Sequence, residues 1–331
     1  MGRSSLIVCV VAVAAAIAAA AMAVAPAWVD RANGERMAVI GAVDTVTYLA
    51  PPPIGQIRGA IAPWRVGIQA GHWKIADLPD EQIRLRGDTG AQWGPLHEAD
   101  VNLRIATAVA DDLRDAGVLV DLLPATVPVG YDADAFVAIH ADDGGGTQAS
   151  GWKVSAPWRA SEASRALSDA IAQWYGSISG LSEDRYGVSY NMRGYYGFSW
   201  NRFEHAIAPT TPAAIIETGF LTSAIDRRLI VDDPDRAAGA IAMAVLSYLG
   251  ERASMRPADL VPRAYPPMEV VADGAPLRYR PEAGERVAAR LPAGTWVRPV
   301  GEENGWIELI VWGNYRVFGW MEKDDLREVP G

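Results

Sequence analysis

The segment Ala135-Phe136-Val137-Ala138-Ile139-His140 decides how the fold is interpreted, because an unbroken apolar run leads directly into a histidine. A short, continuous apolar run is typical of a strand that is buried on both faces, as in a parallel sheet. Similar, mostly apolar runs lie at residues 66–70, 118–123 and 213–217. We therefore predict a buried strand at each of these places.

Helical patterns alternate with these strands. Within residues 98–116, apolar side chains recur at every fourth position, which is the spacing of one helix face, and Gly117 follows as a C-terminal stop. Ser161 is placed to cap a second helix, and Asp233 with Pro234 opens a third. Strands that alternate with helices of this length predict an α/β fold with a mainly parallel sheet flanked by helices.

The termini have a different composition from this α/β region, which we place at residues 64–251. Residues 1–29 contain an uncharged, alanine-rich stretch that is long enough to span a membrane and also offers small residues for signal cleavage. We predict a signal peptide or membrane anchor there, and linkers at residues 30–63 and 252–267. In residues 268–331, short β-type runs are separated by turns that contain Gly and Asn, which predicts a small all-β, barrel-like domain.

The overall composition excludes several classes of protein. Half of the residues are apolar, as in a folded protein, and 40 acidic residues against 30 basic ones give a net charge of −10. A nucleic-acid-binding protein would need a basic face that neutralises phosphates, so we expect no nucleic-acid partner. The single cysteine, Cys9, excludes an intramolecular disulfide and a cysteine-based zinc cluster.

The chain contains only four histidines, and the positions of two of them suggest a metal site. His72 and His140 each end a predicted strand, and open parallel sheets bind ligands beyond the carboxyl ends of their strands. Glu98 opens the first predicted helix, and Glu217 ends another strand. Two imidazoles, one carboxylate and an open fourth position make a hydrolytic zinc site, and a second carboxylate then remains to move protons.

The residues alone leave other interpretations open. A histidine at a strand end is more often a hydrogen-bonded structural residue than a ligand, and a glutamate at a helix start often complements the helix dipole. His97 competes with Glu98 for the role of ligand, and their spacing does not choose between them. His205 lies in an irregular segment, where contact with solvent or substrate is the better interpretation.

Four motifs occur in a defined order along the chain. They are Ala70-Gly71-His72, Glu98 leading into Asn102, Ala138-Ile139-His140-Ala141, and Glu217-Thr218-Gly219-Phe220-Leu221-Thr222. Together they resemble the motifs of the zinc-dependent N-acetylmuramoyl-L-alanine amidases, over roughly residues 64–250. The resemblance implies that His72, Glu98 and His140 are the zinc ligands and that Glu217 is the catalytic carboxylate. It also favours Glu98 over His97.

Three positions depart from the pattern of this family. Trp73 follows His72 where the family usually has Gly, Asp142 replaces the usual Asn, and Ser223 stands where Asn is frequent. None of these changes removes a predicted ligand or Glu217. We therefore expect an active enzyme, with the differences affecting substrate detail.

Residues 268–331 look like a bacterial Src-homology-3-like domain. Together with the amidase resemblance, this implies a function at the cell wall. We expect an exported peptidoglycan hydrolase that cuts the amide between N-acetylmuramic acid and L-alanine, with zinc-activated water and Glu217 as general base and acid. Peptidoglycan is the expected partner, and the membrane is a second one if residues 1–29 stay uncleaved. The alternatives are a non-hydrolytic cell-wall-binding protein and a zinc peptidase that acts on stem peptides.

Overall fold

The computed structural model describes residues 63–146, 148–314 and 316–329. The predicted signal peptide or anchor at residues 1–29 lies outside the described residues, as does almost all of the predicted linker at residues 30–63. Among the helices that are described, none is both long and apolar enough to cross a bilayer.

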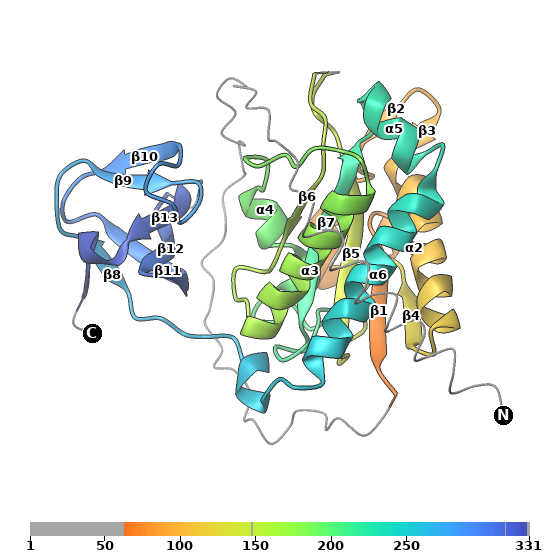
Figure 1. The fold of residues 1–331 in the computed structure, drawn as a ribbon, viewed down its shortest axis with the longest axis horizontal. Helices are drawn as coiled ribbons and strands as arrows, with labels where there is room; N and C mark the ends of the chain where they lie inside the picture. Colours follow the sequence, from red (N-terminus) through yellow and green to blue (C-terminus); the bar gives the residue numbers. More distant parts are fainter. Residues whose placement is uncertain (1–62, 147, 315, 330–331) are drawn as a thin grey trace. The chain divides into compact units, whose positions relative to one another are not determined.

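The main sheet has the strand order β4-β1-β5-β7-β6 (Figure 1). The strands are β1 (Arg65–Ala70), β4 (Leu119–Leu123), β5 (Ala135–Asp142), β6 (Lys153–Ser155) and β7 (Ala213–Phe220). Neighbouring strands run parallel, apart from the antiparallel pair of β6 and β7. The four predicted strands are confirmed, and the short antiparallel strand β6 is an addition that the apolar pattern did not indicate.

Three long helices cover one face of this sheet (Figure 1). They are α2 (Glu98–Asp115), α3 (Glu162–Ile178) and α6 (Pro234–Arg252), and all three were predicted from the sequence. Ser161 caps α3 as expected, because its hydroxyl oxygen accepts a hydrogen bond from the backbone N–H of Ser164. The α/β fold with a mainly parallel sheet is therefore confirmed.

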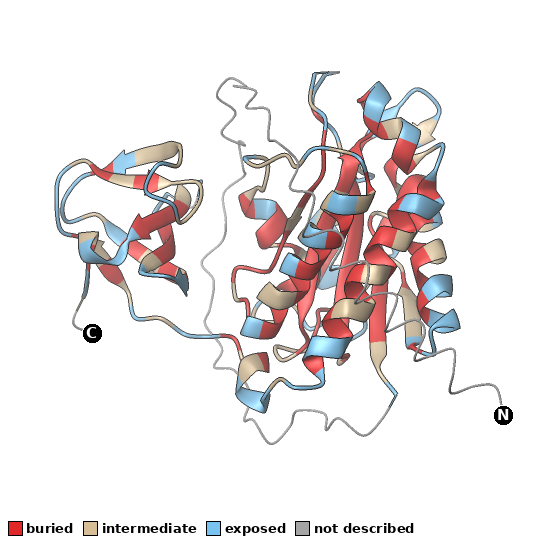
Figure 2. Cartoon of the chain, viewed as in Figure 1, coloured by how far each residue is buried: buried red, intermediate tan, exposed pale blue. Residues whose placement is uncertain are grey.

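The two faces of the sheet have separate apolar cores, which is why the strands are buried so completely (Figure 2). Side chains alternate along a strand, so Val137 and Ile139 of β5 pack beneath the long helices, whereas Phe136 and Ala138 point to the other face. On that other face lies a mostly irregular segment that includes Phe198. This segment contains α4 (Tyr190–Arg193) and the 3-10 helix η4 (Tyr196–Phe198).

Smaller elements surround the carboxyl ends of the strands. The segment between β1 and α2 contains the 3-10 helices η2 (Ile75–Asp77) and η3 (Asp80–Leu85), followed by the hairpin of β2 (Gln92–Trp93) and β3 (Leu96–His97). After β7 comes the short helix α5 (Ala224–Ile230). The 3-10 helix η5 (Pro257–Leu260) lies in the predicted linker at residues 252–267.

The C-terminal region forms its own antiparallel sheet, with the strand order β10-β9-β13-β12-β11-β8-β14. Its elements are β8 (Met268–Val270), β9 (Ala275–Arg278), β10 (Val287–Leu291), β11 (Trp296–Glu303), β12 (Trp306–Val311), β13 (Phe318–Glu322), the 3-10 helix η6 (Lys323–Asp325) and β14 (Leu326–Glu328). Leu277, Val297 and Leu309 belong to its separate apolar core. The all-β character is as expected, and the kinship to Src-homology-3-like domains stays a prediction.

Candidate active site

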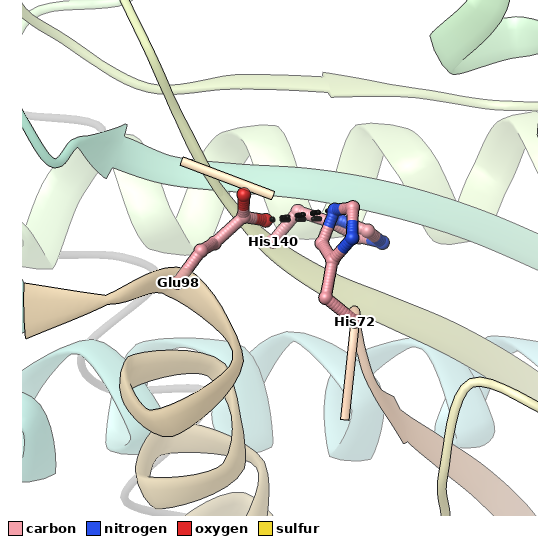
Figure 3. Close-up of side chains that lie close together, drawn as sticks. All are labelled: His72, Glu98 and His140. Carbon is pink, nitrogen blue, oxygen red and sulfur yellow. Dashed lines mark hydrogen bonds and ion pairs between the residues drawn. The ribbon is translucent and has the colours of Figure 1, made fainter. Parts of the chain in front are cut away.

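His72, Glu98 and His140 come together at the carboxyl ends of β1 and β5 (Figure 3). The Nδ1 atom of His140 lies 3.0 Å from Oε1 of Glu98, and Nε2 of His72 lies 3.4 Å from the same oxygen. One candidate ligand atom from each residue lies within 4.8 Å of the others. We call these three residues the His72–Glu98–His140 cluster.

His72 follows β1 after one residue, Gly71, where the backbone turns sharply. Its φ angle of 60° lies in the left-handed region, which is rare for a residue with a side chain. Its Nδ1 atom lies 2.7 Å from the carbonyl oxygen of Asp88. Since a carbonyl oxygen only accepts hydrogen bonds, Nδ1 carries the proton, and Nε2, on the side of Glu98, is left able to bind a metal.

The backbone before α2 holds the carboxylate of Glu98. The N–H of Ala91 donates to Oε2 at 2.7 Å, and the amide of Asn102 donates both to Oε1 at 3.0 Å and to the carbonyl oxygen of Gly71 at 3.1 Å. Burial opposes ionisation of Glu98, but the hydrogen bond with His140 and the nearby imidazoles lower its pKa to about 2. Glu98 is therefore a carboxylate, as a metal ligand must be.

Gly90 makes this close approach possible. It has a φ angle of 77°, and a Cβ atom there would overlap Oε2 of Glu98 and lie 2.8 Å from Cδ2 of His72. Only glycine combines this backbone conformation with the space that the site leaves.

His140 is buried at the end of β5, and the ring of Tyr195 packs edge-on against it with 5.2 Å between the ring centroids. Among the described residues, Nε2 of His140 is a buried atom without a hydrogen-bond partner. An orphaned imidazole nitrogen beside a second imidazole and a carboxylate fits a metal ion, and this donor set suits zinc.

Glu217 lies on the neighbouring strand, directly opposite His140 in the pairing of β7 with β5. Its side chain is partly exposed, yet its Oε2 atom is buried and has no hydrogen-bond partner among the described residues. Burial, followed by the negative charges of Asp142 and Glu98, raises the pKa of Glu217 to about 8. A carboxyl group in this environment is suited to accept and return a proton.

The other two histidines lie outside the cluster. His97 is exposed at the N-cap of α2, while Glu98, one residue later, is buried and points to the site. His205 contacts Glu81 instead, with its Nδ1 2.9 Å from Oε1 of Glu81. Sequence reasoning missed two further neighbours of the site, Tyr195 and Lys153. Neither lies in a pattern that distinguishes a site residue from an ordinary one.

Comparison with known proteins gives a family match over most of the α/β region. A family model described as N-acetylmuramoyl-L-alanine amidase matches residues 66–247. No curated protein sequence matches the chain.

Several solved structures are similar to part of this chain. An N-acetylmuramoyl-L-alanine amidase of Nostoc punctiforme is 22% identical, covering 56% of this chain and 97% of its own, with a TM-score of 0.41. The catalytic domain of the amidase CwlV from Bacillus (Paenibacillus) polymyxa var. colistinus is 23% identical, covering 56% and 98%, also with a TM-score of 0.41. An N-acetylmuramyl-L-alanine amidase of Mycobacterium smegmatis is 16% identical, covering 58% and 100%, again with a TM-score of 0.41.

Proposed function

The chain belongs to the N-acetylmuramoyl-L-alanine amidase family, and from this premise we propose that it is an exported, zinc-dependent hydrolase of peptidoglycan. The bond that it cuts is the amide between N-acetylmuramic acid and L-alanine. One observation supports this most directly: the His72–Glu98–His140 cluster has the partly exposed Glu217 beside it, at the edge of the sheet where ligands bind.

In this proposal the cluster residues and Glu217 have different tasks. His72, Glu98 and His140 hold the metal. When bound, zinc supplies a Lewis acid that polarises an amide carbonyl and makes water a better nucleophile. Glu217 takes the proton of the attacking water at its free carboxyl oxygen and gives it to the departing amine of L-alanine.

Export follows from where the substrate is. Peptidoglycan lies outside the cell membrane, and the uncharged stretch within residues 1–29 supports either cleavage of a signal or retention as an anchor. The net charge of −10 supports attachment by specific contacts, because bulk charge would repel the chain from an anionic surface.

Product analysis tests the proposal. The zinc-loaded full chain is incubated with peptidoglycan, and the fragments are identified by mass spectrometry. We expect free stem peptides with a new amino terminus at L-alanine, together with glycan strands that lack peptides. Disaccharides that still carry their stem peptides would show a glycosidase, and shortened stem peptides would show the alternative zinc peptidase.

Two variants with the same chemical change provide the controls. Glu217→Gln should retain zinc and lose about 10²–10⁴-fold in kcat, the range typical of general acid–base catalysis. Glu282→Gln, at an exposed position of the C-terminal region, should behave like the wild type. Wall binding without any product, in buffer that contains zinc, would instead support the non-hydrolytic alternative.

A further inference from the structure

A buried lysine lies in line with the proposed catalytic residues. Lys153 of β6 is directly opposite Glu217 of β7, and Glu217 is directly opposite His140 of β5. Residues that face each other across paired strands project to the same side of the sheet. His140, Glu217 and Lys153 therefore form a row across three neighbouring strands.

The ammonium group of Lys153 is enclosed by acidic and aromatic groups. Its side chain is only 7% exposed, and its Nζ atom forms a close ion pair with Oδ2 of Asp142. The same Nζ lies 3.6 Å from Oδ2 of Asp184 and 4.6 Å from the centre of the Phe220 ring. A buried charge carries a large desolvation cost that close pairing must offset, so the position of Lys153 opposite Glu217 needs an explanation.

Charge balance shows what the lysine does at this place. Nζ of Lys153 pairs with Asp142, and Lys153 itself lies directly opposite Glu217 in the pairing of β6 with β7. Without the ammonium group, Asp142 and Asp184 would lose the cation that contacts both of them, on the strand next to Glu217. Burial alone would lower the pKa of Lys153, but the charges of Asp142 and then Glu217 hold it above its usual value, so the side chain stays charged.

We propose that Lys153 is a positioning residue for Glu217. By pairing with Asp142, it screens that carboxylate from Glu217 and leaves the Oε2 atom of Glu217 without a partner and available for proton transfer. This inference rests on the proposed function, because it assigns Lys153 a part in the same reaction. Lys153 touches neither the substrate nor the metal in this proposal.

The test compares five variants of the zinc-loaded full chain on a soluble muropeptide. Lys153→Met should lower kcat at least 30-fold, while KM and the zinc content stay within a factor of two of the wild type. Lys153→Arg should recover most of the lost kcat, because it keeps the positive charge. Asp142→Asn removes the charge that is screened, so the double variant Asp142→Asn/Lys153→Met should reach a kcat within three-fold of Asp142→Asn alone. Lys323→Met, at an exposed lysine, is the matched control.

Each other outcome overturns the inference. A wild-type kcat in Lys153→Met would mean that the lysine has no part in the reaction. A double variant that stays as slow as Lys153→Met, or that does not fold or bind zinc, would show that Lys153 does not act through Asp142. If Lys153→Met itself fails to fold, the double variant and Lys153→Arg still decide. A wild-type chain that releases no stem peptide would instead refute the proposed function, which separates the two failures.

Discussion

Nδ1 of His140 lies 3.0 Å from Oε1 of Glu98, although the two residues are 42 positions apart in the chain. The contact arises because β5 ends at the edge of the sheet where α2 begins. The backbone N–H of Ala141 also donates to Oε1 of Glu98, at 3.2 Å, so the strand end itself contributes to holding the carboxylate. This contact of the cluster is thus formed by a strand and a helix start of the α/β fold.

This relationship predicts how the metal site responds to loss of a histidine. His140→Ala should abolish binding of the single zinc ion expected per chain, since two remaining ligands rarely hold a catalytic metal. His205→Ala is the matched control, because His205 lies outside the cluster, beside Glu81. Zinc content is measured by elemental analysis after gel filtration, and circular dichroism checks that both variants fold. A full zinc content in His140→Ala would remove this residue from the ligand set.

Gly90 and Gly94 provide a pair that separates backbone strain from damage to the site. Both have positive φ angles, 77° and 57°, but only at Gly90 would a Cβ atom meet Glu98 and His72, whereas Gly94 faces open space. Each Gly→Ala change should lower the free energy of unfolding by about 1–2 kcal/mol through strain.

The affinity for zinc should differ between the two variants. Gly90→Ala should weaken it by about 10–100-fold, the range seen when groups that support metal ligands are disturbed, and Gly94→Ala should leave it unchanged. Zinc titrations and urea unfolding of the metal-free proteins measure the two quantities. Equal affinities in both variants would mean that the backbone at Gly90 does not support the cluster.

Asp226 is expected to be a structural anchor near the end of β7. The carboxylate is fully buried and accepts four hydrogen bonds, from the backbone N–H groups of Gly151 and Phe220 and from the hydroxyls of Ser150 and Ser223. Asp226→Ala should lower the free energy of unfolding by about 2–4 kcal/mol, because buried donors lose their acceptor.

An exposed aspartate gives the comparison for this loss. Asp235→Ala, in the first turn of α6, should change the free energy of unfolding by at most about 1 kcal/mol. Urea unfolding of the metal-free proteins separates the two cases. A loss of less than 1 kcal/mol in Asp226→Ala would show that water replaces the carboxylate.

Much of the site follows from local sequence patterns. The apolar run that ends at His140 fixes both the strand and the edge where its histidine lies, and the same logic places Glu217. The choice between His97 and Glu98 does not follow from such a pattern. His97 ends β3 in an extended conformation and Glu98 begins α2, and only the packing of α2 decides that Glu98 is the buried one.

The row of His140, Glu217 and Lys153 could not be predicted from the sequence, for a different reason. β6 has only three residues, Lys153–Ser155, and a charged residue at its start gives neither an apolar run nor a clear alternation. Its position depends on pairing with β7, and Lys153 is neutralised by Asp142 from another strand. The left-handed backbone of His72 is likewise not predicted from the sequence, since this conformation is uncommon for any residue with a side chain.

A last prediction concerns acid stability and the segment between β1 and α2. Glu81 of η3 accepts hydrogen bonds from the backbone N–H groups of Glu204 and His205, at 2.9 and 2.8 Å, and contacts Nδ1 of His205. Burial slightly opposes ionisation, but these hydrogen bonds lower the pKa of Glu81 below its usual 4.5. A lowered pKa means that the charge of Glu81 stabilises the fold at pH values above its usual pKa, and this stabilisation is lost as the pH falls through the folded-state pKa.

Glu81→Gln should therefore be less stable than the wild type at pH 7, by at most about 1 kcal/mol for so exposed a pair, and the difference should shrink towards pH 3. Urea unfolding is measured in chelator, so that loss of zinc from the histidines on acidification does not contribute. Glu282→Gln, at an exposed position, should show no such pH dependence. The contrary result is that the two proteins differ equally in free energy of unfolding at pH 7 and pH 3. That result would mean that hydrogen-bond geometry, rather than the charge of Glu81, holds η3 against the segment around His205.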